Sequence, residues 1–391
     1  MTNPLVSVVI PVRNDADNLR ACVGALRKSS YPDFETIVVD DASTDQTADV
    51  AEQMEARVVR LRPRLGPAGA RNAGAQCARG EYLLFVDADV CVGQDTIGRF
   101  VTHLERDPAT DAAFGSYNSR PSSGNLVSQY RNLLHHHVHQ TANAAASTFW
   151  SGCGFIRRAV FLEFGGFDAS YGRPAIEDIE LGMRLAKAGR RIRLCKDVQV
   201  THRKRWTLWT MIRTDILDRA IPWTLLILKE KSLPNDLNLK TSQRIGGLFS
   251  CLFVVGLLGL SIFNPVLLAI LLLLLCGFVT LDRWSLNHPI PRLARIAVVA
   301  LGAGLAFHFT FELGVEFLVI LVLAAGVAAL NLPLLEFFGH VRKPLFIGIA
   351  LPLHTLYLTY SSVTFAGCVL WHLTTHLATL GGYRRRPRSP Q

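Results

Sequence analysis

Charge is distributed unevenly along this chain, and that division limits the folds open to it. Half of the 391 residues are hydrophobic, and the formal net charge is +10. Up to about residue 244, charged and apolar residues are mixed as in an ordinary α/β protein. Beyond that point the acidic residues are only Asp282, Glu312, Glu316 and Glu336, and the nine basic residues lie between the apolar blocks or after the last of them. This segregation predicts a soluble domain followed by membrane-embedded helices.

The apolar part of the chain contains four blocks of roughly 16 to 18 residues, at the short end of what crosses a bilayer. They are residues 246–263, 265–281, 296–311 and 314–330. Basic residues follow each pair of blocks, and Glu312 and Glu316 occupy the opposite turn. The positive-inside rule therefore places the soluble domain and the basic loops on the cytoplasmic side.

A fifth apolar stretch, residues 345–373, has basic residues on both flanks. A single crossing would place the arginines at 384–386 outside the cell, so we favour a re-entrant or interfacial element here. The predicted organisation is a soluble domain over 1–205, an amphipathic helix and linker over 206–244, a transmembrane region over 245–373 and a basic tail over 374–391.

The segment after residue 205 has helical periodicity with tryptophan on its apolar face. Apolar residues recur every three or four positions, at Trp206, Trp209, Ile212, Ile216, Ala220, Trp223 and Ile227. This pattern predicts an amphipathic helix at the bilayer interface, broken or kinked at Pro222. The alternative is a helix packed on the soluble domain.

Composition also limits the compartment and the partners of the chain. Residues 5–12 are too short and too β-branched for a signal peptide, so the soluble domain is expected at the cytoplasmic face of the cell inner membrane. The eight cysteines form no Cys-x-x-Cys pair, which predicts reduced thiols. The net positive charge suits binding to anionic lipid headgroups and nucleotide phosphates. The sequence lacks the interleaved basic and aromatic residues typical of nucleic-acid binding, so nucleic acid is not expected as a partner.

The first 115 residues alternate between predicted strands and helices. Strands are expected at 7–12, 36–39, 56–61 and 82–86, and helices at 18–27, 48–54 and 69–77. Further strands at 112–117 and 154–157 and a helix at 178–188 follow. This order predicts an α/β fold with a mostly parallel, doubly wound sheet. Ligands of such sheets bind at the carboxyl ends of the strands.

Polar motifs follow the predicted strands at this common edge. Pro11, Val12 and Asn14 end the first strand and are expected to contact a nucleotide sugar, as is Asp41 after the second. Arg71 lies in a glycine-rich helix start, where free N–H groups and a guanidinium favour a diphosphate. Asp41 could accept the imide N–H of a uracil or guanine base.

Asp87 and Asp89 follow the strongly apolar strand at 82–86. A sheet core rejects ionised carboxylates, so two of them at a strand end indicate a site. Carboxylates together with substrate phosphates suit Mg²⁺ or Mn²⁺. The alternative for an isolated Asp-x-Asp is a polar exit from the strand.

These segments together resemble the family 2 glycosyltransferases with the GT-A fold. The resemblance covers roughly the first 205 residues and is carried by SVVIP at 7–11, VVDDASTD at 38–45, ARNAG at 70–74, DAD at 87–89 and ED at 177–178. It implies inverting transfer from a nucleoside diphosphate sugar, such as a UDP- or GDP-sugar. It further implies nucleotide and diphosphate contacts for Asp41 and Arg71, ribose or metal contact for Asp87, and metal binding for Asp89.

By the same resemblance, Asp178 is the expected catalytic base. Inversion requires a carboxylate that accepts the proton of the acceptor. Glu177 and Glu180 lie beside it at a helix start, where helix capping alone could explain one or two acidic residues. Glu177 is a candidate for acceptor or diphosphate binding.

The segment His202-Arg203-Lys204-Arg205-Trp206 resembles the Q-x-x-R-W motif of membrane-bound synthases of this family, with His202 in place of glutamine. The resemblance implies a candidate metal ligand in His202, because other members of the family carry a histidine near this position that completes the metal site. Arg205 and Trp206 are candidates for acceptor or diphosphate binding. The alternative for the basic residues is contact with lipid phosphates.

Two further features have structural alternatives. His135, His136, His137 and His139 lack a completing cysteine or carboxylate, so a helix near the acceptor entrance is expected rather than a zinc site. Gly152 could allow close approach of an acceptor to the backbone, or could mark a tight strand entry.

The sequence thus predicts a metal-dependent, inverting glycosyltransferase that acts on a membrane lipid, either a polyprenyl phosphate or a glycolipid. A processive polysaccharide synthase and a non-catalytic scaffold that binds sugar nucleotides are the alternatives. The short membrane region and the substituted glutamine disfavour the first, and the retained carboxylates disfavour the second.

Overall fold

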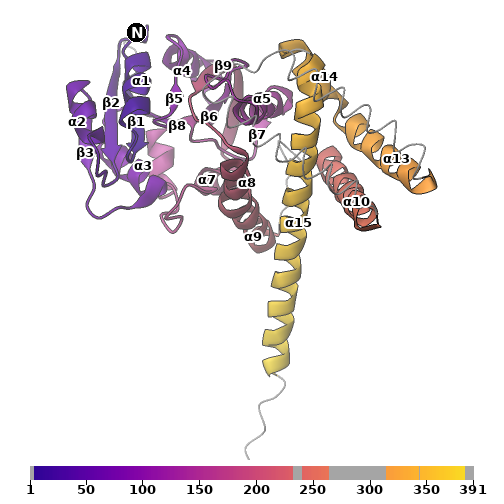
Figure 1. The fold of residues 1–391 in the computed structure, drawn as a ribbon. Coiled ribbons are helices and arrows are strands. Elements are labelled where there is room, and N and C mark those ends of the chain that lie inside the picture. Colours follow the sequence, from indigo (N-terminus) through magenta and orange to yellow (C-terminus); the bar gives the residue numbers. More distant parts are fainter. Residues whose placement is uncertain (1–3, 232–239, 264–313, 343, 384–391) are drawn as a thin grey trace, which may run out of the picture.

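The computed structural model describes residues 4–231, 240–263, 314–342 and 344–383. An α/β domain lies to one side, and the long C-terminal helices stand beside it (Figure 1). A nine-stranded sheet forms the centre of this domain, with strand order β3-β2-β1-β4-β8-β6-β9-β5 and β7 paired to β9. The predicted α/β domain followed by a helical region is confirmed.

The first half of the domain follows the predicted βαβ order. Strands β1 (Val6–Val12), β2 (Phe34–Asp40), β3 (Arg57–Arg60) and β4 (Tyr82–Val86) pair in parallel. They are connected through α1 (Ala16–Leu26), α2 (Thr47–Gln53) and α3 (Gly66–Cys77). The carboxyl ends of β1, β2 and β4 therefore lie at one edge of the sheet.

The second half adds antiparallel strands and one long strand that the sequence analysis did not predict. It contains β5 (Val90–Cys91), α4 (Thr96–Arg106), β6 (Thr110–Tyr117), α5 (Leu126–Thr141), β7 (Ala145–Ala146), β8 (Cys153–Arg157), α6 (Arg158–Glu163), α7 (Glu177–Lys187) and β9 (Arg191–His202). Strand β8 is antiparallel to β4 and β6. Strand β9 runs parallel to β6 and brings His202 to the edge where β5 begins.

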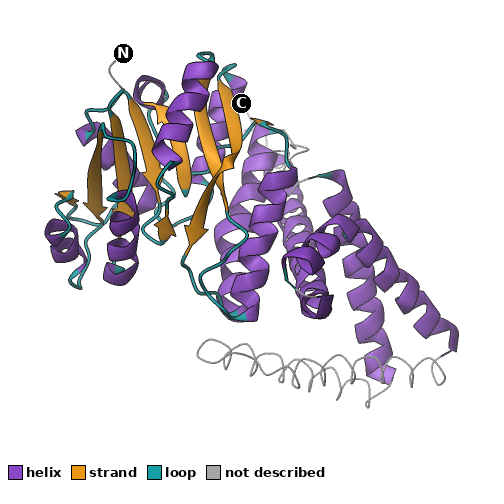
Figure 2. Ribbon diagram, turned by 90° about the horizontal axis from the view of Figure 1, so that it is seen from above, coloured by secondary structure: helices purple, strands orange, loops and turns teal. Residues whose placement is uncertain are grey.

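Helices cover both faces of this sheet (Figure 2). Alternation along the strands divides the core into two apolar clusters, because successive side chains of a strand point to opposite faces. Val8 and Leu84 belong to one cluster, whereas Val9 and Phe85 belong to the other. All four side chains are completely buried, so the central strands are rigid supports for the polar residues at their ends.

A helical run follows the α/β domain as α8 (Leu208–Arg213), the π-helix η1 (Thr214–Ala220) and α9 (Ile221–Glu230). Pro222 lies in the first turn of α9, directly after the π-helical segment. The tryptophans predicted to share one interfacial face differ in exposure: Trp206 is 2% exposed and Trp209 is 71% exposed. That part of the prediction is wrong for Trp206, because it packs against α5 and the C-terminal helices.

The C-terminal region consists of α10 (Thr241–Phe263), α13 (Gly314–Leu330), α14 (Leu332–Val341) and α15 (Pro344–Tyr383). Two described helices are long and apolar enough to cross a membrane, over Thr241–Leu260 and Phe346–Thr375. Helices α13 and α14 bend by 69° and would form a third span if counted together. The apolar blocks predicted at 265–281 and 296–311 lie outside the described residues.

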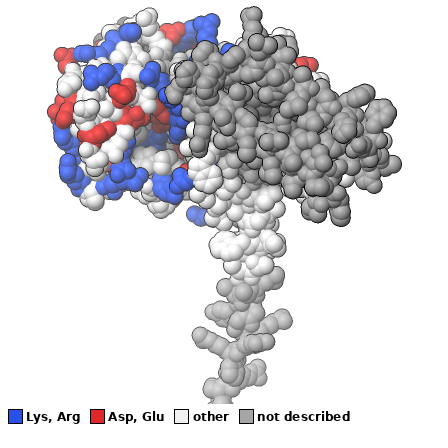
Figure 3. Space-filling model, viewed as in Figure 1, with Lys and Arg blue, Asp and Glu red and all other residues white. Residues whose placement is uncertain are grey.

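Helix α15 corrects one sequence prediction. Residues 345–373 are one continuous helix with Pro352 inside it, so the re-entrant form of the prediction is wrong, whereas its interfacial form stays a prediction. Hydroxyl groups of Thr355 and Thr359 donate to carbonyls one turn earlier, which is compatible with an unbroken helix in apolar surroundings. Charged side chains gather on the α/β domain, whereas the described part of α15 shows none (Figure 3).

Candidate active site at the carboxyl edge of the sheet

Arg71 brings together two motifs that are far apart in the sequence. Its Nη2 lies 2.6 Å from Oδ1 of Asp87, at the end of β4, and its Nη1 lies 2.9 Å from Oε1 of Glu177, at the start of α7. Arg71 and Glu177 are buried, whereas the side chain of Asp87 is 35% exposed. Burial opposes the charge of Arg71, but the two carboxylates outweigh it and raise its pKa. The guanidinium is therefore a fixed positive charge between both motifs.

Asp178 follows Glu177 in the first turn of α7, and its carboxylate is held by three donors. Oδ2 accepts hydrogen bonds from the backbone N–H and the hydroxyl of Ser151, and Oδ1 accepts from the N–H of Ile179. Burial and the neighbouring charge of Glu177 raise the pKa of Asp178 to about 6. A carboxylate with such a pKa accepts protons effectively near neutral pH.

Asp89 and His202 meet at the opposite side of the same strand end. Nε2 of His202 lies 3.4 Å from Oδ2 of Asp89, and the backbone N–H of Arg203 donates to the carbonyl of Asp89. Burial disfavours the charge of Asp89, but His202 and Lys204 lower its pKa overall. Strand β9 is what places His202 there, by pairing it with Val90 of β5.

The side chains at this strand end offer a partial donor set for a divalent cation. Among the described residues, no group of three or more His, Cys, Asp or Glu side chains is close enough to hold a metal ion. The pair Asp89 and His202, with Asp87 two residues away on the same strand end, suits a cation that completes its shell with water and substrate phosphate, as Mg²⁺ does. Within the described ranges, Asp87, Asp89, Glu177 and Asp178 bring four carboxylates against Arg71 and Lys204, a balance that favours a bound cation.

The residues expected to contact the nucleotide lie at the ends of β1 and β2. Val12 ends β1, and Pro11 pairs with Val39 of β2. Asn14 has a positive φ of 51°, and its side chain accepts from the N–H of Thr44. This contact ties together the loops that follow β1 and β2, at the carboxyl edge of the sheet.

The carboxylate of Asp41 makes more contacts within the protein than the sequence suggested. Its two oxygens accept from the backbone N–H groups of Leu65 and Gly66, at the start of α3, and Arg64 lies 3.5 Å away. Gly66 has φ of +75°, and an added Cβ would overlap the backbone of Gly172. In this structure Asp41 therefore fixes the entry of the helix that carries Arg71.

Two of the other candidates have packing roles, and a third is exposed. A Cβ on Gly152 would overlap the Trp150 ring at 2.6 Å, and the Gly152 carbonyl accepts from the N–H of Asp87. Trp206 is buried, and its backbone is held by Ser128 and Asn125 of the α5 region. Arg205 directly precedes Trp206 and is exposed.

The histidine-rich segment is the helix α5, as predicted. His136 and His139 bond through Nδ1 to the backbone carbonyls of Tyr117 and Gly115. His135 lies 4.4 Å from the Tyr117 ring and 5.0 Å from the Trp150 ring, between centroids. Burial lowers the pKa of His135, His136 and His139, so these rings are neutral packing groups near physiological pH.

Sequence analysis did not single out three residues that touch the site. Ser151 holds Asp178, Asn132 bonds to His202, and the Tyr117 ring stacks on His202 at 4.4 Å between centroids and 8° between planes. Ser151 adjoins the glycine pair at 152 and 154, which is a local signal. Asn132 and Tyr117 carried none, because their partners lie 70 and more residues away.

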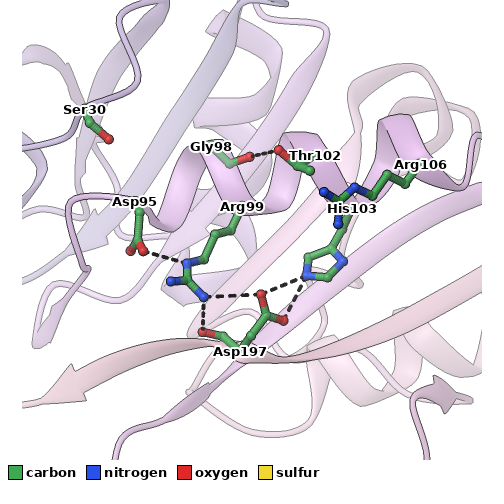
Figure 4. A pocket seen from close by; sticks show the side chains of 8 residues that line it. All are labelled: Ser30, Asp95, Gly98, Arg99, Thr102, His103, Arg106 and Asp197. Carbon is green, nitrogen blue, oxygen red and sulfur yellow. Dashed lines mark hydrogen bonds and ion pairs between the residues drawn. The ribbon is translucent and has the colours of Figure 1, made fainter.

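A surface cavity elsewhere in the domain has a different character (Figure 4). It encloses about 380 Å³ beside α4 and is lined by Arg99, His103 and Asp197, among others. Asp197 pairs with both Arg99 and His103, and Asp95 pairs with Arg99. The basic groups that Figure 4 shows bonded are thus matched by carboxylates, in contrast to the excess of carboxylates at the strand ends.

Comparison with known proteins shows what the α/β domain is similar to. Residues 7–165 match the family model described as glycosyl transferase family 2. The chain is 32% identical over 127 residues to glycosyltransferase GlyG of Streptococcus pneumoniae, covering 31% of this chain and 42% of the relative. It is 28% identical over 181 residues to the PGL/p-HBAD biosynthesis glycosyltransferase of Mycobacterium bovis, covering 44% and 66%. The predicted resemblance to family 2 glycosyltransferases is confirmed over residues 7–165.

The chain covers only 18% of the length of another relative, the poly(ribitol-phosphate) beta-glucosyltransferase of Bacillus spizizenii, with 33% identity over 118 residues and 28% of this chain. Among solved structures, it is similar to the mannosyltransferase PcManGT from Pyrobaculum calidifontis in complex with GDP-Man and Mn²⁺. That match has a TM-score of 0.48 and 22% identity and covers 85% of this chain and 88% of the other. The family assignment rests on the sequence match.

Proposed function

We propose that this chain is an inverting, divalent-metal-dependent glycosyltransferase that moves a sugar from a nucleoside diphosphate to a lipid in the membrane. The observation that carries the proposal is the bridge that Arg71 makes between Asp87 and Glu177. It joins the carboxylates at the end of β4 to the helix start that bears Asp178. A leaving-group side and an acceptor side thereby face one crevice.

On the donor side, the proposal assigns the nucleotide to the ends of β1 and β2 and the diphosphate to the neighbourhood of Arg71 and Asp89. A nucleoside diphosphate is strongly anionic, and the site already holds more carboxylates than basic groups. A cation held by Asp89 and His202, beside Asp87, would supply the positive charge that the leaving diphosphate needs. This electrostatic requirement supports the dependence on Mg²⁺ or Mn²⁺.

On the acceptor side, Asp178 is assigned as the base. An acceptor hydroxyl attacks the anomeric carbon from the face opposite the diphosphate, the bond to the diphosphate oxygen breaks with its electron pair, and Asp178 takes the hydroxyl proton. The raised pKa of Asp178 suits this transfer. A phosphate acceptor, largely deprotonated near neutral pH with a second pKa of about 6, would need Asp178 only for orientation.

The proposed membrane acceptor rests on the packing between the site and the helical region. Trp223 of α9 packs in one cluster with Ile176 and Ile179, which flank Asp178. Trp209 on the same helical run is exposed, as suits a side chain at the bilayer surface. Two or three candidate spans then hold this edge of the domain beside the bilayer, at the cytoplasmic face in our proposal.

The test is product analysis with the full-length chain. Membranes that contain the protein are supplied with a panel of UDP- and GDP-sugars, and the lipid extract is examined by mass spectrometry. We expect one lipid class to gain one sugar mass, only with added Mg²⁺ or Mn²⁺. Membranes with the Asp89→Ala variant at equal expression are the matched control and should show no gain.

Two results would contradict the proposal. A sugar–lipid product formed at full rate in the presence of a chelator would contradict the proposed dependence on a divalent metal. If nucleotide is released with soluble acceptors but with none of the lipid extracts, the proposed lipid acceptor is wrong. The proposed glycosyl transfer would still stand.

A further inference from the structure

We infer that Asn132 is a positioning residue for the metal site, because it fixes which ring nitrogen of His202 faces Asp89. The inference rests on the proposed function, in which Asp89 and His202 hold the divalent cation. It assigns a role to a residue of α5, a helix outside the sequence motifs of the site.

The orientation of the Asn132 amide is set by its own surroundings. Its Nδ2 donates to the carbonyl of Ser128, one turn earlier on α5, at 3.1 Å. Its Oδ1 is therefore the atom directed at His202, 2.7 Å from Nδ1. Asn132 is 1% exposed and His202 is 7% exposed, so water does not compete for this bond.

This orientation determines the tautomer of His202. Because Oδ1 of an amide only accepts hydrogen bonds, Nδ1 of His202 must carry the proton. When the ring carries only this one proton, its electron pair is on Nε2, which lies 3.4 Å from Oδ2 of Asp89. A divalent cation between these two atoms would take the place of a proton shared by the ring and the carboxylate.

The plane of the ring is fixed as well. Tyr117 stacks on His202 with 8° between the ring planes, and the Trp150 ring meets Tyr117 edge-on. The stack permits the ring to slide or turn within its plane, and the bond from Nδ1 to Asn132 removes that freedom. Bonds of this kind behind a metal-binding histidine set its orientation and basicity.

Helix α5 itself is anchored on its other side. Tyr130 bonds through its hydroxyl to Nδ1 of His354 in α15, and Arg131 lies 2.6 Å from Asp215 in η1. Three consecutive residues of α5 thus contact the long C-terminal helix, the π-helix and the metal-site histidine. The position of Asn132 is consequently set by the helical region and not only by the sheet.

The test measures Mn²⁺ on the full-length protein in detergent without donor or acceptor. Electron spin echo spectroscopy detects nitrogen coupled to bound Mn²⁺, and titration gives the affinity. In the wild type we expect a histidine nitrogen signal that His202→Ala removes. Asn132→Leu, which has similar size but no acceptor, should remove or weaken that signal and lower the Mn²⁺ affinity by about 10- to 100-fold.

Two further variants separate positioning from general damage. Asn132→Asp keeps an acceptor for the Nδ1 proton and should retain the signal with affinity within about threefold of the wild type, well short of the 10- to 100-fold loss expected without an acceptor. Gln140→Leu removes another side-chain amide that links α5 to β9, through the carbonyl of Lys196, and should leave the signal intact. Should Asn132→Leu fail to fold, Asn132→Ser takes its place, because a serine hydroxyl is too short to reach Nδ1.

Each outcome decides a specific point. A wild-type signal that persists at full affinity in Asn132→Leu overturns the role of Asn132 and leaves the proposed function untouched. Absence of any histidine signal in the wild type overturns the inference together with the metal ligand His202, while sugar transfer is judged separately by the lipid products. Equal losses in Asn132→Leu and Asn132→Asp would also overturn it, because the acceptor atom would then be irrelevant.

Discussion

Two buried arginine–carboxylate clusters in the described part of the chain differ in their charge balance. At the strand ends, the single arginine Arg71 contacts Asp87 and Glu177, and Asp178 follows directly. Beside the helical region, Asp215 is contacted by two arginines, Arg131 and Arg219, and by the hydroxyl of Tyr360.

The carboxylates of the two clusters also differ in their exposure to solvent. Asp87 has a side chain that is 35% exposed, whereas the side chain of Asp215 is 4% exposed and has each oxygen hydrogen-bonded. The first cluster has carboxylates to spare and opens to solvent, so a ligand can complete it. The second is complete as it stands and joins α5, η1 and α15. Charge balance, more than burial, separates the candidate site from the structural contact.

The comparison predicts the largest effect at Arg71. Arg71→Met leaves the buried Glu177 and the neighbouring carboxylates without their basic partner, which should cost about 3–5 kcal/mol of stability. We expect a strongly lowered thermal midpoint and no measurable sugar transfer. Thermal unfolding in detergent and donor binding check this. A variant with normal stability and normal donor binding would show that the cluster is not held by Arg71.

The next effect is on the base. Asp178→Asn keeps the shape of the side chain and its bonds to Ser151 in part, but it cannot take a proton. For a hydroxyl acceptor we expect the turnover number to fall by roughly 10²-fold or more with donor affinity near normal. Steady-state kinetics with the identified acceptor measure both. If donor affinity falls while turnover is kept, Asp178 is a binding residue.

A smaller effect on the rate of sugar transfer is expected when the pH is lowered. The pKa of Asp178 is raised to about 6, so the carboxylate that accepts the proton is lost as pH falls through that value. At pH 5 the rate should be about one tenth of its plateau, with full activity above pH 7. The rate of the wild type should show this fall at acidic pH, and the rate of Asp178→Asn should not. If the fall persists in the variant, it reports protonation of the acceptor, as expected for a phosphate acceptor.

Much of this arrangement was predictable from local sequence. The run Tyr82–Val86 is entirely apolar and buried, and carboxylates directly after it mark the edge where ligands bind. The start of α7 was predictable in the same way, from acidic residues ahead of an amphipathic pattern. In both cases the signal lies within about ten residues, which is the range over which periodicity and end residues determine an element.

The remainder depended on contacts across the chain. Arg71 and Glu177 are 106 residues apart, and no local pattern indicates that they pair. Strand β9 was missed because Lys196 interrupts the alternation of the apolar Ile192, Leu194, Val198 and Val200. Trp206 was assigned to the bilayer because periodicity shows which face of a helix is apolar but not what covers it. Helix α5 covers it here.

The smallest effect should come from the complete cluster, through the substitution matched to Arg71→Met. Arg131→Met leaves Asp215 bonded to Tyr360 at 2.6 Å and to Arg219 at 3.1 Å, so the buried carboxylate keeps partners. The loss should be about 1–3 kcal/mol of stability, as for one missing polar partner. The rate of sugar transfer should stay within about threefold of the wild-type rate. This is a smaller change in activation free energy than the one that corresponds to one pKa unit, or a tenfold change in rate. The same unfolding and kinetic measurements test it, and a loss of activity as large as that of Arg71→Met would mean that the contact with the helical region is part of the active site.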